Sequence, residues 1–350
     1  MGIIPTMENG EILDNDKQRN AFGVIGAKVI ENNLNILECC GSPVHLGSNL
    51  LIDAFFDTAS IDLGSSNMIV SAGSNIFLGS VYDDFQDASI DGTKWSTNHN
   101  FIESGGSLYY DSGTFQSSTV TASIIADGTD NLNAKNVSGN YEIMMHFGTS
   151  LRKGNDAGDL VHASILVTDG TSEVILRTYE VLSGEVSTSD EIVNLVFDGP
   201  GSLVDVYVNG SPTNLNVDVS TVSGDWNIMF AGRATEDDGT DFGRLAMFVR
   251  AIGFVDGSGG VASMVSTAQT HSSTVEAVIP WASLESRGNE FLIEASANGG
   301  VDYTPVKESQ LGSITVSGTS VRAKIIGSLP SSILSTSINI GEIKGYGVLY

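Results

Sequence analysis

The sequence has little of three things that whole protein classes depend on: cysteine, basic residues and long apolar runs. Its 350 residues include 2 cysteines and 16 Lys and Arg against 42 Asp and Glu, for a formal net charge of −26. Phosphate contacts need clustered Lys and Arg, so this balance argues against nucleic-acid binding. No stretch approaches the roughly 18 uninterrupted apolar residues of a membrane-spanning helix. The N-terminus shows no basic region followed by an apolar one, so we expect no secretory signal and synthesis in a cytosol.

The two cysteines, Cys39 and Cys40, are adjacent in the chain. Neighbouring cysteines rarely bridge each other, because the ring that would form is strained. A disulfide framework and a thiolate zinc site are therefore both excluded. We interpret the pair as small, partly buried side chains, and a bridge between protomers is the alternative.

Patterns of familiar catalytic sites are also missing. The chain has no G-x-S-x-G, Walker A or H-E-x-x-H motif. A retaining glycosidase needs two carboxyl groups about 5–5.5 Å apart, and no strand carries the alternating carboxylates that would supply them. A zinc site needs three or four convergent ligands, whereas the histidines are scattered at His45, His99, His146, His162 and His271. We therefore expect no enzyme, and polysaccharide cleavage is the last of the alternatives.

What the sequence does contain is short β-branched runs separated by Gly, Asn, Asp and Ser, which is typical of strands and tight turns. Helical periodicity is weak, and its one candidate, residues 18–30, contains Gly23 and Gly26, which lower helix propensity. The 40 glycines follow no three-residue period, so they indicate turns and not collagen. The pattern predicts an all-β fold of antiparallel sandwiches, with strands at 118–126, 163–167, 174–179 and 192–197.

Composition divides the chain into four segments. Residues 1–80 are irregular apart from one expected hairpin at 65–79, and they lack an obvious core of their own. Residues 81–256 form a long strand-rich block, and 257–269 begin with a Gly/Ser-rich stretch that indicates a flexible linker. Residues 270–350 form a smaller strand-rich block with an apolar end. We expect an anchoring segment, two β-domains and a linker, so that deleting 1–80 leaves a folded fragment.

Four motifs of the long block follow one another in a familiar order. They are DDFQDASIDGTKW at 83–95, GGSLYY at 105–110, LVDVYVNGSPTNL at 203–215 and GRLAMFVRAIGF at 243–254. The set resembles the concanavalin-like lectin or laminin G-type jelly roll over about half of the chain, from 81 to 256. The resemblance implies two curved, packed antiparallel sheets with loops at one rim available for ligands. In the smaller block, EFLIEASANGGVDYTPV at 290–306 resembles small β-sandwich modules of bacteriophage tail, fibre and appendage proteins.

One acidic loop is a candidate calcium site. Calcium takes six to eight oxygen ligands, and several carboxylates in one loop can supply them. The resemblance adds that rim loops of such jelly rolls often hold calcium. The alternative is that these are acidic turn residues of an acidic protein. The first candidate is Glu236, Asp237, Asp238 and Asp241; the others are Asp127, Asp130 and Asn131, and Asp156 with Asp159.

Exposed aromatic side chains are candidates for sugar binding, because the apolar faces of sugars stack on rings. The alternative is burial, since the two tryptophans occupy positions where the resembled fold usually has core. The candidates are Trp95, Tyr109, Tyr110 and Trp226.

These observations lead to two hypotheses of different class. The first is a structural virion protein of a bacteriophage, such as a fibre, spike, appendage or decoration protein, located in the virion. It would contact host-surface polysaccharide, and residues 1–80 would form a homo-oligomer, such as a trimer, or bind other virion proteins. The second is a carbohydrate-binding adhesin module of a cell surface. The sequence implies no cofactor other than the candidate calcium.

Overall fold

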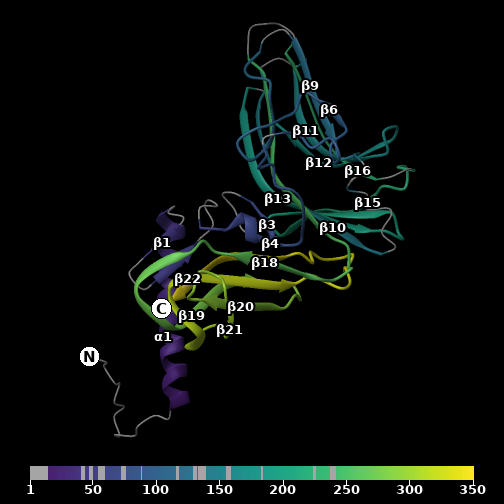
Figure 1. The fold of residues 1–350 in the computed structure, drawn as a ribbon. Helices are drawn as coiled ribbons and strands as arrows, with labels where there is room; N and C mark the ends of the chain where they lie inside the picture. Colours follow the sequence, from purple (N-terminus) through teal and green to yellow (C-terminus); the bar gives the residue numbers. More distant parts are fainter. Residues whose placement is uncertain are drawn as a thin grey trace.

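The computed structural model describes residues 15–40, 44–46, 50–53, 60–71, 76–87, 89–115, 118–128, 132, 139–154, 159–182, 184–223, 226–236 and 242–350. The protein is built from antiparallel strands and one long helix, which confirms the all-β prediction. Figure 1 shows two β-domains: a teal one at the top and a green-to-yellow one below it. We call them the jelly roll and the C-terminal domain. In the described part of the chain, no helix combines the length and apolarity needed to cross a membrane.

The jelly roll consists of two antiparallel sheets that pack on one apolar core, as predicted. The larger sheet has the order β15-β14-β13-β10-β17-β8-β7, with β5 paired to β17. Its strands are β5 (Ser80–Asp83), β7 (Ile102–Glu103), β8 (Leu108–Asp111), β10 (Tyr141–Arg152), β13 (Val186–Asp198), β14 (Leu203–Val208), β15 (Ser211–Asp218) and β17 (Arg244–Val255). The smaller sheet is β12-β11-β16-β9-β6, with strands β6 (Thr97–His99), β9 (Ser118–Ile125), β11 (Leu160–Thr168), β12 (Glu173–Glu180) and β16 (Asn227–Glu236).

Local sequence accounts for much of the jelly roll. The β14–β15 hairpin turns at Asn209 and Gly210, whose φ angles of 48° and 79° are the positive values that a two-residue hairpin turn requires. Alternating residues of the long strands point into the core, where aromatic rings pack between the sheets. Phe147, for example, stacks on Phe230 of the facing sheet with ring centroids 5.5 Å apart. The four strands predicted between 118 and 197 correspond to β9, β11, β12 and β13.

The C-terminal domain is one ten-stranded antiparallel sheet that encloses a core of its own. Its path is β1-β2-β23-β19-β22-β20-β21, with β18 on β22 and the β3–β4 pair on β23. The strands are β1 (Val44–Leu46), β2 (Leu50–Asp53), β3 (Ile69–Val70), β4 (Ile76–Leu78), β18 (Val261–Val265), β19 (Gln269–Glu285), β20 (Phe291–Ser296), β21 (Thr304–Val306), β22 (Gly312–Ser328) and β23 (Gly341–Leu349). A short 3-10 helix, η1 (Leu63–Ser65), precedes β3.

The first 80 residues are not a separate segment, which corrects the sequence-based division. Strand β2 pairs with the last strand, β23, from Leu50 opposite Leu349, and β4 pairs with the start of β23. Five side chains of this region belong to the core of the C-terminal domain because they are buried among its strands: Leu51, Ile61, Met68, Ile76 and Leu78. A fragment of residues 81–350 would therefore lack part of that core. The expected hairpin does form, as β3 and β4.

The region also contains the helix α1 (Asn15–Cys40), which is longer than the weak periodicity predicts. Two glycines near the middle of α1 weaken the helical signal in the sequence, but the packing of the helix requires them. A Cβ on Gly23 would lie 2.3 Å from the Ser309 carbonyl oxygen, and one on Gly26 would lie 2.5 Å from Ile279. The glycines that lower helix propensity thus let α1 lie directly on the sheet. The side chains of Cys39 and Cys40 lie outside the described residues.

The Gly/Ser-rich composition predicts a flexible linker at residues 257–269, but part of this segment is an ordered strand. They include β18, which pairs with β22 and buries Ala262, Met264 and Val265. Positive φ angles at Gly257, Gly259 and Gly260 give the chain a turn into this strand. The link between the domains is therefore short and ordered.

The two domains share a buried junction. Ile69 and Phe77 of the C-terminal domain pack with Met144 and Val196, which project from the outer face of the larger jelly-roll sheet. Beside them, the fully buried Glu142 carboxylate on β10 accepts four hydrogen bonds. Asn194 Nδ2 donates to Oε1 at 2.8 Å; Oε2 accepts from Asn339 N at 2.5 Å, Asn339 Nδ2 at 3.2 Å and Ile340 N at 3.3 Å. We call this arrangement the Glu142 clasp.

Candidate functional site

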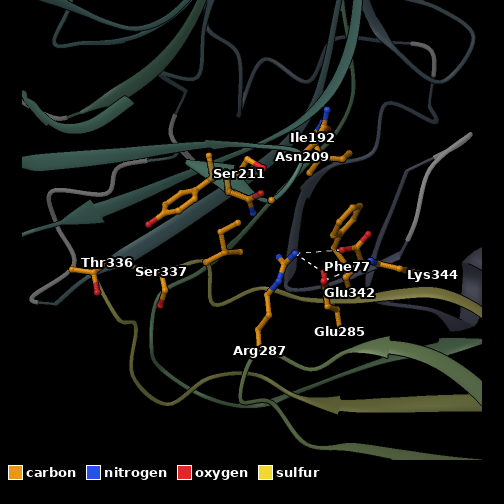
Figure 2. Close-up of a pocket in the computed structure, with 14 residues that line it drawn as sticks. Phe77, Ile192, Asn209, Ser211, Glu285, Arg287, Thr336, Ser337, Glu342 and Lys344 are labelled. Atoms are coloured by element: carbon orange, nitrogen blue, oxygen red, sulfur yellow. Dashed lines mark hydrogen bonds and ion pairs between the residues drawn. The ribbon is translucent and has the colours of Figure 1, made fainter. Parts of the chain in front are cut away.

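The candidate site is a cleft between the jelly roll and the C-terminal domain, with a volume of about 720 Å³. That size falls within the usual range of small-molecule sites, about 300–1,000 Å³. One wall comes from β13 and the β14–β15 hairpin, and the other comes from β4, the β19–β20 turn and β23 (Figure 2). The loop before β23 closes one side. The lining residues are Phe77, Ile192, Asn194, Tyr207, Asn209, Gly210, Ser211, Glu285, Arg287, Thr336, Ser337, Ile338, Glu342 and Lys344.

Arg287 is the fixed cation of this cleft. Figure 2 shows its guanidinium group pointing toward Glu285 and Glu342. Its Nη2 donates to Glu285 Oε2 at 2.8 Å and to Glu342 Oε2 at 3.4 Å, and its Nη1 donates to the Ile340 carbonyl oxygen at 2.8 Å. The residue has a left-handed backbone, with φ 47°, which is uncommon for a long side chain. Three hydrogen-bond partners thus hold the planar guanidinium in one orientation.

The charges of the cleft are paired. Lys344 Nζ lies 3.6 Å from Glu285 Oε1, so two cations face two carboxylates. A hydrogen bond between the two carboxyl groups of Glu285 and Glu342 lowers the pKa of Glu285; burial opposes this shift, and the nearby charges of Arg287 and Lys344 add to it. The two cations thus offset the two carboxyl groups, and the cleft lacks the strong negative charge of a chain whose net charge is −26.

The rest of the lining offers neutral hydrogen-bonding groups beside apolar surface. Asn209, Ser211 and Thr336 are exposed, and Ile192 and Ile338 are half-buried. The site thus combines amides and hydroxyls, an ion-paired cluster and a small apolar strip. Such a lining suits an uncharged ligand that both donates and accepts hydrogen bonds.

The structure does not bring the predicted aromatic residues together. Trp95 and Trp226 are buried at 2% and 1% exposure, so neither ring can stack on a sugar, which corrects that prediction. Their indole nitrogens donate inside the protein, Trp95 Nε1 to Asp83 Oδ2 at 2.8 Å and Trp226 Nε1 to the Val222 carbonyl oxygen at 3.0 Å. Both rings fill the jelly-roll core, as the alternative interpretation holds.

The two tyrosines of β8 point to opposite sides of their sheet, because successive residues of a strand alternate. Tyr110 packs inward against Phe101, with ring centroids 6.0 Å apart. Tyr109 lies opposite Phe248 of β17 and donates its hydroxyl to Asp111 Oδ2 at 2.7 Å. Tyr109 is thus half-buried on the outer sheet face and does not line the cleft. The four candidate rings therefore do not share one surface.

The calcium prediction stays a prediction. Asp237, Asp238 and Asp241 lie outside the described residues, as do Asp130, Asn131 and Asp156; Glu236 and Asp159 are buried. Asp127 accepts hydrogen bonds from Ser96 Oγ at 2.8 Å and from Thr97 N at 2.9 Å. Within the described ranges, no three His, Cys, Asp or Glu side chains gather in a way that could hold a metal ion.

Sequence reasoning missed the cleft because its residues come from separate segments of both domains. The Asn209-Gly210 turn was visible as a hairpin signal, but nothing in the sequence places it opposite Arg287. The pairing of β4 with β23 and the packing of the two domains create that arrangement.

Comparison with known proteins gives structural likenesses only. No protein-family model matches the chain, and no curated protein matches it. Among solved structures, the carbohydrate recognition domain of Emp47p has 9% identity and a TM-score of 0.35, covering 51% of this chain and 97% of its own. The corresponding domain of Emp46p in its potassium-bound form has 8% identity and a TM-score of 0.33, covering 50% and 96%. The PL7 alginate lyase AlyA1 from Zobellia galactanivorans has 14% identity and a TM-score of 0.29, covering 54% and 95%. At these values the likenesses assign neither a ligand nor an activity to this chain.

Proposed function

We propose that this protein is a structural component of a bacteriophage particle that binds an uncharged saccharide of the host surface in the interdomain cleft. The observation that carries the proposal is the lining of the cleft: neutral amide and hydroxyl groups next to a charge-paired Arg287 cluster. Two ordered β-domains form the cleft together, so its walls are held in place by the buried junction.

An uncharged saccharide matches this lining. Sugar hydroxyls donate and accept hydrogen bonds, and the cleft offers both kinds of partner on Asn209, Ser211 and Arg287. The apolar strip formed by Ile192 and Ile338 suits the C–H face of a sugar ring. An acidic polysaccharide would meet no excess positive charge in the cleft and a strongly negative protein around it.

The proposal is for binding and not for cleavage. A glycosidase needs one carboxyl group whose raised pKa lets it remain protonated as a general acid. The pKa of Glu285 is shifted in the opposite direction, through the hydrogen bond between its carboxyl group and that of Glu342 and through the positive charges of Arg287 and Lys344. Release of reducing ends from a host polysaccharide by the purified protein would contradict this part of the proposal.

The location in a virion and the assembly into a homo-oligomer, such as a trimer, belong to the same proposal. Their support is the sequence resemblance of residues 290–306 to phage appendage modules, together with the apolar surface that α1 exposes. The alternative is an adhesin on a cell surface. Peptide mass spectrometry of purified particles separates the two: the adhesin reading requires the protein in a cell-envelope fraction and its absence from particles.

Saccharide binding is tested by filling the cleft. Thr336→Trp introduces a large ring at an exposed lining position, whereas Leu334→Trp introduces the same ring two residues away, where the side chain is 63% exposed and does not line the cleft. On an array of neutral bacterial oligosaccharides we expect Thr336→Trp to weaken binding by about tenfold or more, a loss of about 1.4 kcal/mol. The Leu334→Trp control should bind like the wild type. Equal binding by both variants, or no binding by the wild type, would refute the assignment.

A further inference from the structure

The helix α1 has two apolar faces, and the described residues cover one of them. Ile30 and Leu34 are buried at 0% and 2% exposure, where they pack with Leu50, Trp281 and Leu349 of the C-terminal domain. On another side of the same helix, three large apolar side chains face outward: Phe22 at 41%, Ile25 at 62% and Val29 at 39% exposure. We call Phe22, Ile25 and Val29 the outer stripe. The described residues leave the outer stripe uncovered.

The spacing of the outer stripe identifies what can cover it. Its members are three and four positions apart, and the exposed Asn32 follows after three more. In the sequence the same alternation of four and three extends from Gln18 to Ile36. A 3-4 spacing is the heptad pattern by which one helix packs along another of the same pattern. A copy of α1 from a second molecule supplies such a partner.

Charge points to the same partner. Association of identical copies is opposed by their net charge of −26. Helix α1 carries three acidic and three basic residues, so it is neutral, and all of the excess negative charge lies elsewhere in the chain. Copies that meet along α1 therefore approach through an element without net charge. Figure 1 shows that α1 lies at the side of the C-terminal domain and that one end projects beyond it.

We infer that copies of this chain associate through the outer stripe of α1, by helix–helix packing in the coiled-coil manner. This inference rests on the assembly of copies proposed above and names the surface that carries it. It is independent of the cleft, to which α1 contributes no residue. Self-association and saccharide binding are thus separable properties of one protein.

The helix itself provides a matched pair of variants. Ile25→Ser removes an apolar side chain from the outer stripe, and Val24→Ser removes a similar one, 58% exposed, about a third of a turn away. The full chain is measured at micromolar concentration by sedimentation equilibrium and light scattering, against the single-chain mass of 36.7 kDa. We expect a multiple of that mass for the wild type and Val24→Ser. For Ile25→Ser we expect the single-chain mass, or a dissociation constant raised about tenfold or more.

A second pair tests the same surface without removing apolar area. Asn32→Asp places a negative charge on the line of the outer stripe, and Asn35→Asp places the same charge at another exposed position of α1. Like charges brought together between copies repel, and salt screens them. We therefore expect Asn32→Asp to dissociate the assembly at low ionic strength and to recover in high salt, while Asn35→Asp has no effect.

Three results would overturn the inference. They are a wild-type protein with the mass of one chain, an assembly that withstands both Ile25→Ser and Asn32→Asp, and equal dissociation by the control variants. Far-UV circular dichroism confirms that each variant is folded. Retained saccharide binding in a dissociated variant separates the outer stripe from the cleft. Loss of saccharide binding in the Thr336→Trp variant with assembly intact separates them in the other direction.

Discussion

The Glu142 clasp predicts a pH-dependent step in stability that a single substitution isolates. The Glu142 carboxylate is completely buried, and burial raises its pKa from 4.5 to about 6, against the opposing effect of its four hydrogen bonds. Between these two pH values the folded protein holds a proton that the unfolded chain releases. The stability associated with this proton is present below pH 4.5 and is lost as the pH rises through about 6. A shift from 4.5 to about 6 corresponds to about 2 kcal/mol.

Glu142→Gln is the variant that removes the titration and keeps most of the contacts. The glutamine oxygen replaces Oε2 and accepts from Asn339 and Ile340, and its amide faces Asn194, whose own amide reorients to present oxygen. The free energies of unfolding of wild type and variant are measured in urea between pH 4.5 and 7.5. We expect the wild type to lose about 2 kcal/mol relative to Glu142→Gln over that interval.

The control is Glu173→Gln, an exposed carboxylate at the start of β12. Its difference from the wild type should stay flat across the same interval. A flat difference for Glu142→Gln as well, or one that changes in the opposite direction, would refute the reasoning. Glu142→Ala tests the contacts themselves: it leaves buried donors without an acceptor, two of them backbone N–H groups. Because each buried donor without an acceptor costs about 1–3 kcal/mol, we expect the two backbone donors alone to lower the free energy of unfolding by about 2–6 kcal/mol.

Three further predictions concern other parts of the fold. Burial lowers the pKa of His146 from 6.5; the charge of Asp190 opposes this shift, and the charge of Arg250 adds to it. Below pH 6.5 the unfolded chain therefore takes up a proton more readily than the folded protein, so the free energy of unfolding should fall as the pH drops below 6.5. The His146→Asn variant should lose this dependence in the same urea assay. Deletion of residues 1–80 should unfold the C-terminal domain, and a folded 81–350 fragment in circular dichroism and NMR spectra would contradict the packing described above. Trp95→Phe should cost about 1–2 kcal/mol in urea unfolding, because it removes the hydrogen bond to buried Asp83, and should leave saccharide binding unchanged.

The sequence by itself determined the strands of the jelly roll. Alternating apolar residues and a tight-turn dipeptide are local signals, and Asn209-Gly210 with its flanking strands forms the predicted hairpin. For Trp95 and Trp226 the sequence left two alternatives open, an exposed ring that binds sugar or a ring buried in the core. Only the closure of two sheets over both rings decided it, because burial depends on what faces a strand from elsewhere in the chain.

Tertiary structure alone decided the role of the first 80 residues and the location of the cleft. Gly23 and Gly26 lower helix propensity in the sequence, but in the structure Gly23 packs against the turn at Ser309 and Gly26 packs against Ile279 of β19, where a Cβ would not fit. Leu50 and Leu349 pair from opposite ends of the chain, and no local periodicity encodes such a partner. The cleft depends on the same long-range packing, since Arg287 meets the β14–β15 hairpin only where two domains bury apolar faces against each other. The alternation of a strand depends on residues that are adjacent in the sequence, whereas a site between domains depends on how two distant surfaces pack against each other.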